Sequence, residues 1–222
     1  MKRLISLLLC LITVLPAAGC ATKIEKRDRN VSELRDELMI AETEKMKVTL
    51  MSGEREEPFV IDGAPGERTP FSVVTIAPRG FRDDAEFSYT AYIGAEKLEG
   101  KFSRHPYKNT YSVELPVRAE TSAAVTVTTD GYAENFDLKS VKTAEMISAS
   151  VALETAEIRL KDRIKELTAD GELKAEIYVR FTENPISGDG GYYWYVAFVP
   201  EKYTVYAVLI DPATKEIAAV RE

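Results

Sequence analysis

The chain has 222 residues, with 29 lysines and arginines against 36 aspartates and glutamates, so its formal net charge is −7. Binding to a nucleic-acid backbone depends on a basic face, and this acidic balance argues against a nucleic-acid partner. The one histidine, His105, lies in a polar loop, and no catalytic triad, Cys-His pair or His-Glu-x-x-His zinc motif surrounds it. The composition favours a non-enzymatic protein without a metal or an organic cofactor.

Residues 1–20 have the pattern of an export signal. Lys2 and Arg3 form a short positive head, residues 4–15 are apolar, and small residues precede Cys20. The apolar run is too short for a permanent transmembrane helix. Removal of residues 1–19 would leave 203 of the 222 residues and, with Lys2 and Arg3 gone, would change the net charge from −7 to −9. Cys10 would leave with them, so the mature chain could form no internal disulfide.

The tail Ala17-Ala18-Gly19-Cys20 resembles the bacterial lipoprotein box, with Ala17 where leucine is most common. The resemblance implies that a diacylglyceryl group is attached to the sulfur of Cys20, which becomes the first residue after cleavage. It also implies an extracytoplasmic location, anchored to a bacterial membrane. Each buried methylene contributes about 0.8 kcal/mol and stable anchoring takes more than one chain, so two acyl chains would suffice. The alternative is an ordinary secretory peptide, cut near Gly19.

Residues 20–30 are polar and mixed in charge, which suits a tether between the lipid and a folded domain. From residue 31 to about residue 46, apolar residues recur at helical spacing, and Asn30 or Ser32 can cap the segment. The spacing predicts a short amphipathic helix whose apolar face carries Val31, Leu34, Leu38 and Ala41.

Between residues 47 and 141 the pattern changes to the period of two that is typical of strands, with turn signals such as Asp62-Gly63 between the runs. The predicted strands lie at 47–51, 59–61, 71–76, 87–93, 97–102, 110–115 and 123–128. Short strands at this spacing, with no helix between them, favour an antiparallel β-sandwich of immunoglobulin-like size. We therefore predict a first domain at 31–141, made of the helix and the β-sandwich.

The pattern changes again near residue 142. Ser148 or Ser150 can cap a helix that ends at Asp170-Gly171, and its apolar face carries Ala149, Leu153, Ala156, Leu160, Ile164 and Leu167. Strands are predicted at 175–181, 192–199, 205–210 and 217–220. A helix packed on a three- or four-stranded antiparallel sheet buries both apolar faces, so we predict an α+β domain at 142–222.

Two segments of this second domain resemble the two ends of a PepSY-type domain. They are Ser150–Ala156, which opens the helix, and Tyr206–Ile217, which closes the sheet with Lys215 where the family prefers glycine. Similar units of a helix on a sheet occur in cystatin-like folds. The resemblance implies an exported or surface protein and a role in restraining peptidases.

A run of aromatic residues, 192–195, is the candidate binding surface. Strand alternation sends Tyr192 and Trp194 to one face of the sheet and Tyr193 and Tyr195 to the other, and the helix can cover only one face. With Tyr178 nearby, the uncovered row could bind a protein partner or a sugar ring. The alternative is a sheet buried on both sides, by the helix and by the sandwich.

Other chemical motifs are weak. No pair of carboxylates lies in a glycosidase-like motif, and the loop 187–191 matches neither a calcium-binding EF-hand nor a phosphate-binding loop. We therefore expect a lipid-anchored, non-enzymatic envelope protein whose two domains serve binding or assembly. The alternatives are a regulator of an exported peptidase, acting through residues 142–222, and a carbohydrate-binding envelope protein.

Overall fold

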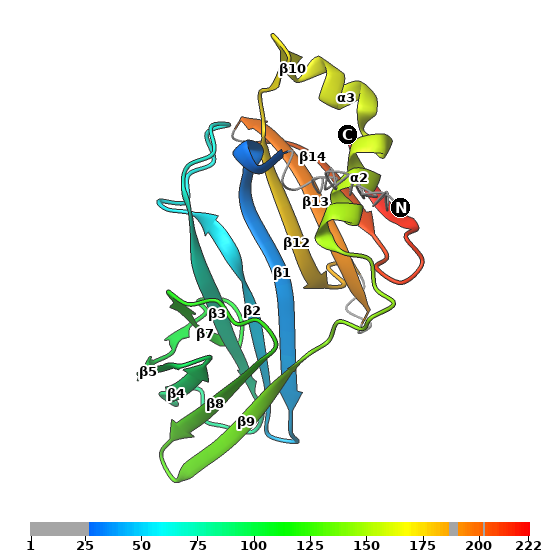
Figure 1. The fold of residues 1–222 in the computed structure, drawn as a ribbon. Coiled ribbons are helices and arrows are strands. Elements are labelled where there is room, and N and C mark those ends of the chain that lie inside the picture. The colour runs from blue at the N-terminus through cyan, green and yellow to red at the C-terminus, as the bar shows by residue number, and fades with distance from the viewer. Residues whose placement is uncertain (1–26, 187–190, 202) are drawn as a thin grey trace, which may run out of the picture.

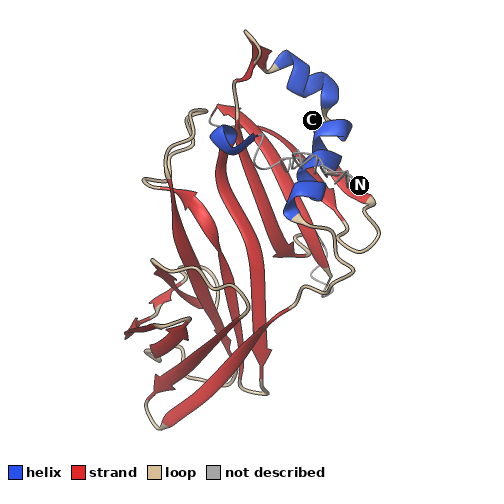
Figure 2. Cartoon of the chain, in the orientation of Figure 1, coloured by secondary structure: helices blue, strands red, loops and turns tan. Residues whose placement is uncertain are grey.

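The computed structural model describes residues 27–186, 191–201 and 203–222, and the chain is mainly antiparallel β-structure (Figure 2). The predicted signal peptide, Cys20 and most of the tether lie outside the described residues. The N-terminal part contains η1 (Asp28–Asn30), β1 (Val31–Glu42), β2 (Met46–Glu56), β3 (Arg68–Pro78), β4 (Ser88–Ile93), β5 (Glu96–Lys101), β6 (Ser103–Arg104), β7 (Tyr111–Leu115), β8 (Ser122–Thr129) and β9 (Tyr132–Ser140). The C-terminal part contains α2 (Ala149–Arg159), α3 (Lys161–Glu166), β10 (Thr168–Ala169), β11 (Glu172–Leu173), β12 (Glu176–Glu183), β13 (Tyr192–Glu201), β14 (Thr204–Ile210) and β15 (Ile217–Arg221).

The long strand β1 organises the molecule (Figure 1). One of its edges pairs with β2 along most of its length, from Glu33 to Glu42. The other edge pairs in parallel with β12 through its first residues and antiparallel with β9 at Met39 and Ile40. We call the strands β1–β9 the N-terminal module, and α2, α3 and β10–β15 the C-terminal module. The expected boundary near residue 142 falls between β9 and α2, while β1 belongs to the sheets of both modules.

The expected helix from residue 31 to about residue 46 is wrong, because this segment forms β1 and the start of β2. Its apolar residues imitate helical spacing for two reasons. Different faces of the strand are buried in different modules, with Leu38 in the C-terminal core and Met39 in the N-terminal core. The pairing with β2 also shifts between Leu34 and Glu37, and such an irregularity interrupts the period of two.

Gly53 on β2 lies opposite this irregularity. A Cβ atom there would lie 1.9 Å from the carbonyl oxygen of Leu34, so the close approach of the two strands requires glycine. The position is thus fixed by backbone contact and not by an unusual φ angle.

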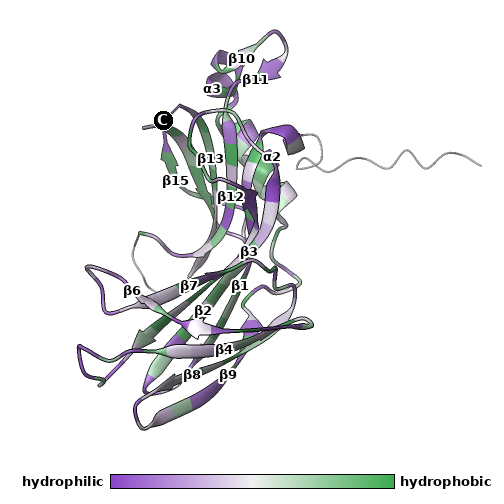
Figure 3. Ribbon diagram, turned by 90° about the vertical axis from the view of Figure 1, so that its left-hand side faces the viewer, coloured by the Kyte–Doolittle hydropathy of each residue, from purple (hydrophilic) through white to green (hydrophobic). Residues whose placement is uncertain are grey.

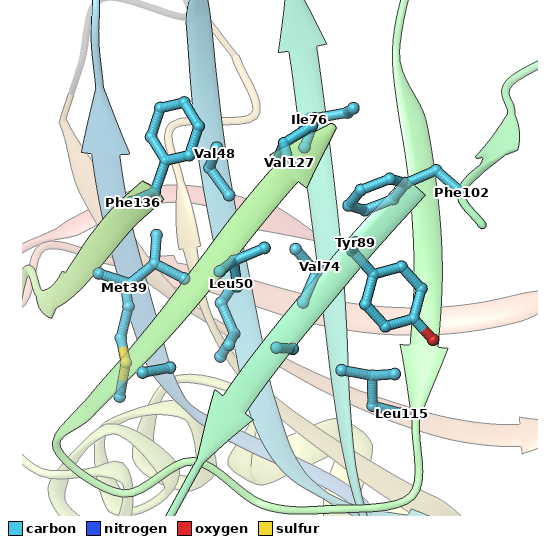
Figure 4. Close-up of a cluster of buried hydrophobic side chains, with 14 of the residues drawn as sticks. Met39, Val48, Leu50, Val74, Ile76, Tyr89, Phe102, Leu115, Val127 and Phe136 are labelled. Carbon is cyan, nitrogen blue, oxygen red and sulfur yellow. The ribbon is translucent and has the colours of Figure 1, made fainter. Parts of the chain in front are cut away.

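In the N-terminal module the sheet curls until it is nearly closed. β9 pairs with β8, β8 with β4, and β4 with β5, while β3 pairs with β7 and β7 with β6. Only Phe102 separates β5 from β6, and its amide donates to the carbonyl of Phe87 (2.9 Å). The enclosed space is filled by side chains that include Met39, Val48, Leu50, Val74, Ile76, Tyr89, Phe102, Leu115, Val127 and Phe136 (Figure 4). A β-rich fold is therefore confirmed for this part.

Two predicted details of this module differ in the structure. Residues 59–61, expected as a strand, lie in the loop 57–67 between β2 and β3. Pro58 has no amide for a strand ladder and the Asp62-Gly63 turn follows at once, so three apolar residues do not extend into a strand. The last strand, β9, was not predicted, because its apolar residues Phe136 and Leu138 stand among charged ones.

The C-terminal module places α2 across one face of the sheet formed by β12, β13, β14 and β15. Ser148 caps α2, its Oγ accepting from the amide of Val151 (3.4 Å). The core between helix and sheet contains Leu153, Ala156, Leu160, Ile177, Phe181, Trp194, Val196 and Val208. Figure 3 shows hydrophobic stretches along the strands of both modules and hydrophilic loops at the far end of the N-terminal module. Within the described part of the chain, no helix has the length and apolar character needed to span a bilayer.

Candidate binding surface

The second face of the C-terminal sheet, turned away from α2, is the candidate surface, and we call it the open face. Strand alternation places Tyr178 and Arg180 of β12 on this face, in register with Ala197 and Tyr195 of β13. Tyr193 follows on the same face, opposite Thr182. Glu33 and Arg35 of β1 continue the same two rows of side chains beyond β12. The open face is therefore built by strands that are distant in sequence.

The aromatic row beneath the helix is part of the core. Trp194 is only 1% exposed, its Nε1 donates to the carbonyl of Ile147 (3.0 Å), and its ring lies 5.0 Å from that of Phe181. Tyr192 also stacks on Phe181, with 5.9 Å between ring centroids. Trp194 therefore presents no ring to solvent, and its expected part in a binding surface is corrected to a structural one.

Tyr178 is also buried, and the loop 57–67 of the N-terminal module, where a strand of the first domain was expected, covers it. The ring of Phe59 lies 5.9 Å from the Tyr178 ring, and the guanidinium of Arg180 lies 5.0 Å from its centroid. The Tyr178 hydroxyl donates to Glu176. Burial raises the pKa of Tyr178, and the neighbouring Glu176 carboxylate raises it further, so this hydroxyl remains a donor. The exposed part of the predicted surface is consequently narrower and contains Tyr193 and Tyr195, both half-buried.

Two buried carboxylates hold the loop 57–67 against the sheet. Glu176 accepts from the amides of Asp62 (2.9 Å) and Gly63 (2.6 Å), and Glu56 accepts from the amide of Gly66 (2.7 Å). Gly63 has a φ of +85°, and a Cβ atom there would lie 2.2 Å from the carbonyl oxygen of Pro200. Burial raises the pKa of Glu56 despite the hydrogen bond from Gly66. The loop is thus fixed at both of its sides.

A cluster of arginines surrounds one buried carboxylate where β1 continues the open face beyond β12. Glu33 is fully buried and receives two hydrogen bonds from Arg180, at 3.0 Å from Nε and 2.8 Å from Nη2. Arg35 forms an ion pair with the same carboxylate, and Arg55 stacks on Phe71 at 4.7 Å. Burial lowers the pKa of Arg35, as does the proximity of Arg180 and Arg55, while Glu33 opposes the shift. Arg55 is also paired with Glu114, so three arginines face two carboxylates, and this small positive excess suits an acidic or amide-bearing group of a partner.

Sequence reasoning found the tyrosines but missed this cluster and the loop. The strand pattern at 176–182 could have indicated which side chains share a face, but nothing local indicates that Glu33 pairs with a residue 147 positions away. The apolar run 59–61 was the one sequence signal that this loop packs against another part of the protein, and it was interpreted as a strand.

Three other candidate sites, a surface hollow, His105 and a metal site, have weaker support from the geometry. A hollow of about 720 Å³ in the N-terminal module lies beside the β4–β5 turn, the loop 116–121 and the adjoining ends of β8 and β9. Two cations, Arg118 and Lys139, line it, and Arg118 is already bound by Asp36 (2.9 and 3.0 Å) and Glu54 (3.2 Å). His105 is exposed and its Nδ1 accepts from the amide of Tyr107 (3.2 Å). Among residues 27–186, 191–201 and 203–222, no group of three histidine, cysteine or acidic side chains is placed to hold a metal ion.

Comparison with known proteins gives no relative from which a function can be transferred. No family model, no curated protein and no solved structure matches this chain. The function is therefore argued from the sequence signal and from the geometry of the described residues.

Proposed function

We propose that this protein is a lipid-anchored, extracytoplasmic component of the bacterial cell envelope that binds a partner protein without converting it chemically. The lipoprotein-box resemblance at Cys20 supports the anchor and the location. The open face supports the binding. Its partly exposed Tyr193 and Tyr195 lie beside Arg180, and tyrosine and arginine are among the residues most enriched at the buried centres of protein interfaces.

The open face is also preorganised. Arg180 is fixed by two hydrogen bonds to Glu33, and both tyrosines stand on a strand that is paired along both edges. Ordering a side chain at an interface costs about 0.5–1.5 kcal/mol, and side chains held in place beforehand avoid much of this cost. Burial raises the pKa of Tyr195 while Arg180 and Arg221 oppose the shift, so its hydroxyl is a neutral donor at physiological pH.

The anchor is tested by fractionation of cells that express the full chain. The wild-type protein should sediment with membranes, and Cys20→Ala should release it, because the substitution removes the only sulfur in the mature chain that can carry the lipid. Retention of Cys20→Ala in the membrane fraction would contradict the anchor.

The binding face is tested in the native envelope with a photo-crosslinking amino acid at Tyr195. A discrete adduct is expected there, and none is expected from the matched position Tyr92, an exposed tyrosine on β4 of the other module. Adducts at neither position, or at Tyr92 alone, would reject the open face as the partner site.

A second candidate is the restraint of an exported peptidase through the C-terminal module. One observation favours it: α2 precedes an antiparallel series of strands, the element order that the PepSY resemblance implies. The whole mature protein, and not an isolated fragment, should be titrated against the exported peptidases of its host, because β1 completes this sheet. A fall in peptidase rate would support the candidate, and unchanged rates would remove it. The carbohydrate-binding alternative is weakened, because the buried Trp194 ring cannot stack on a sugar.

A further inference from the structure

The described chain begins at one end of the molecule, where Arg27 and Asn30 are tied to the C-terminal module. Arg27 Nε donates to Glu157 (2.8 Å), and Asn30 Nδ2 donates to the carbonyls of Leu173 (2.9 Å) and Ala175 (3.1 Å). Seven peptide steps separate Cys20 from Arg27, and an extended chain covers at most about 3.6 Å per residue, or about 25 Å in total. A lipid on Cys20 would therefore hold this end within about 25 Å of the bilayer.

The same end exposes apolar side chains. Phe59, Val60 and Ile61 of the loop 57–67 are 37%, 46% and 40% exposed, and Tyr203 in the β13–β14 turn is 84% exposed. The loop meets the end of β13, just before this turn, where Gly63 approaches the carbonyl of Pro200. Figure 1 shows this loop (cyan) and the end of β13 (orange) beside η1 (blue). We call Phe59, Val60, Ile61 and Tyr203 the apolar tip.

We infer that the apolar tip inserts into the lipid surface that holds the anchor, an inference that rests on the proposed lipidation of Cys20. Aliphatic side chains flanked by an aromatic residue with a polar hydroxyl match the interfacial region of a bilayer. Four acidic side chains, Glu57, Asp62, Glu67 and Glu201, are exposed near the tip and outnumber the nearby Arg29 and Arg68, so the matching surface is zwitterionic and not strongly anionic.

The contact sets the orientation of the molecule. β1 runs away from the tip for 12 residues, or about 40 Å at 3.3 Å per residue, so the loops at the far end of the N-terminal module stand well above the membrane. Tyr193 and Tyr195 lie further along the sheet from the tip than Tyr178, which leaves them accessible beside the bilayer.

The test uses the lipidated protein in phosphatidylcholine vesicles. Cys20 is the only cysteine after residue 19, so a cysteine introduced as Val60→Cys can be labelled alone with an environment-sensitive fluorophore. Tyr203→Cys gives a second site on the tip. Tyr107→Cys, at a 92% exposed position in the far loop where Asn109 contacts Pro78, is the matched control.

Quencher groups on the lipid acyl chains should reduce the fluorescence at positions 60 and 203 at least three-fold more than at position 107, in low salt and in 0.5 M salt alike. Equal quenching at all three positions, or quenching at the tip that high salt abolishes, would overturn the inference while leaving the anchor intact. Protein whose mass shows no diacylglyceryl group, and which does not float with vesicles, would overturn both the anchor and the inference.

Discussion

The buried carboxylate of Glu33 should be one of the largest single contributors to stability. Glu33→Gln keeps the shape of the side chain but removes the charge that balances Arg35 and Arg180. Removing one partner of a buried ion pair costs about 3–5 kcal/mol, because the remaining charge is left uncompensated. The side chains of Arg35 and Arg180 are 21% and 28% exposed, so water can partly solvate them and the lower end of that range, about 3 kcal/mol, is expected.

Urea unfolding of the mature protein, followed by tryptophan fluorescence, measures this loss. Glu99→Gln is the matched control, since Glu99 pairs with Lys97 on the surface and should leave the free energy of unfolding close to that of the wild type. Glu33→Gln combined with Arg180→Met should recover part of the loss, because it removes one unpaired cation. A free energy of unfolding for Glu33→Gln within about 0.5 kcal/mol of the wild-type value, the scatter expected for ordinary surface changes, would refute the reasoning.

Three further predictions concern stability. Trp194→Ala should cost about 3–5 kcal/mol in denaturant unfolding, since it empties a core position, whereas a loss below 1 kcal/mol would mean that the indole is not packed under α2. Gly53→Ala should destabilise by about 2 kcal/mol or more, because the new Cβ meets the carbonyl of Leu34, and a melting temperature equal to that of the wild type would contradict this contact. The pKa of Glu56 is higher in the folded than in the unfolded protein. Protonation of Glu56 therefore stabilises the fold fully at pH values below the pKa of Glu56 in the unfolded chain, and this stability is lost as the pH rises through its pKa in the folded protein. Glu56→Gln should therefore gain stability relative to the wild type between pH 4 and pH 7, and a difference that does not change with pH would oppose this.

Local patterns predicted the elements that depend on local structure. The alternation at 71–76 and 123–128 lies in β3 and β8. The capped apolar stripe after Ser148 was predicted as one helix, and the structure divides it at Leu160 into α2 and α3, with Leu167 as the C-cap of α3. The segment 31–46 was assigned incorrectly because β1 is buried against two modules and changes register midway. Its parallel pairing with β12 joins residues more than 140 positions apart, and no local period reports such a contact.

In the candidate site, too, local features were predicted and long-range contacts were not. Alternation in β13 separated Tyr193 and Tyr195 from Trp194 correctly, since a strand has only two faces. The covering of Tyr178 by Phe59 depends on how a loop 119 residues away folds back, so the sequence left open which face was covered and by what. The arginine cluster around Glu33 forms only because β1, β2 and β12 lie side by side in the sheet, and no local pattern predicts that arrangement.

The position of β1 has a mechanical consequence. β1 begins directly after η1, so under the proposed lipidation of Cys20 a pull between the lipid and a bound partner would load β1 along its own length. Ladder hydrogen bonds run perpendicular to a strand, and those to β2 on one edge and to β12 and β9 on the other would have to be sheared together and not opened one at a time. The membrane attachment proposed for Cys20 would thus enter the fold through the strand best placed to resist extraction under tension.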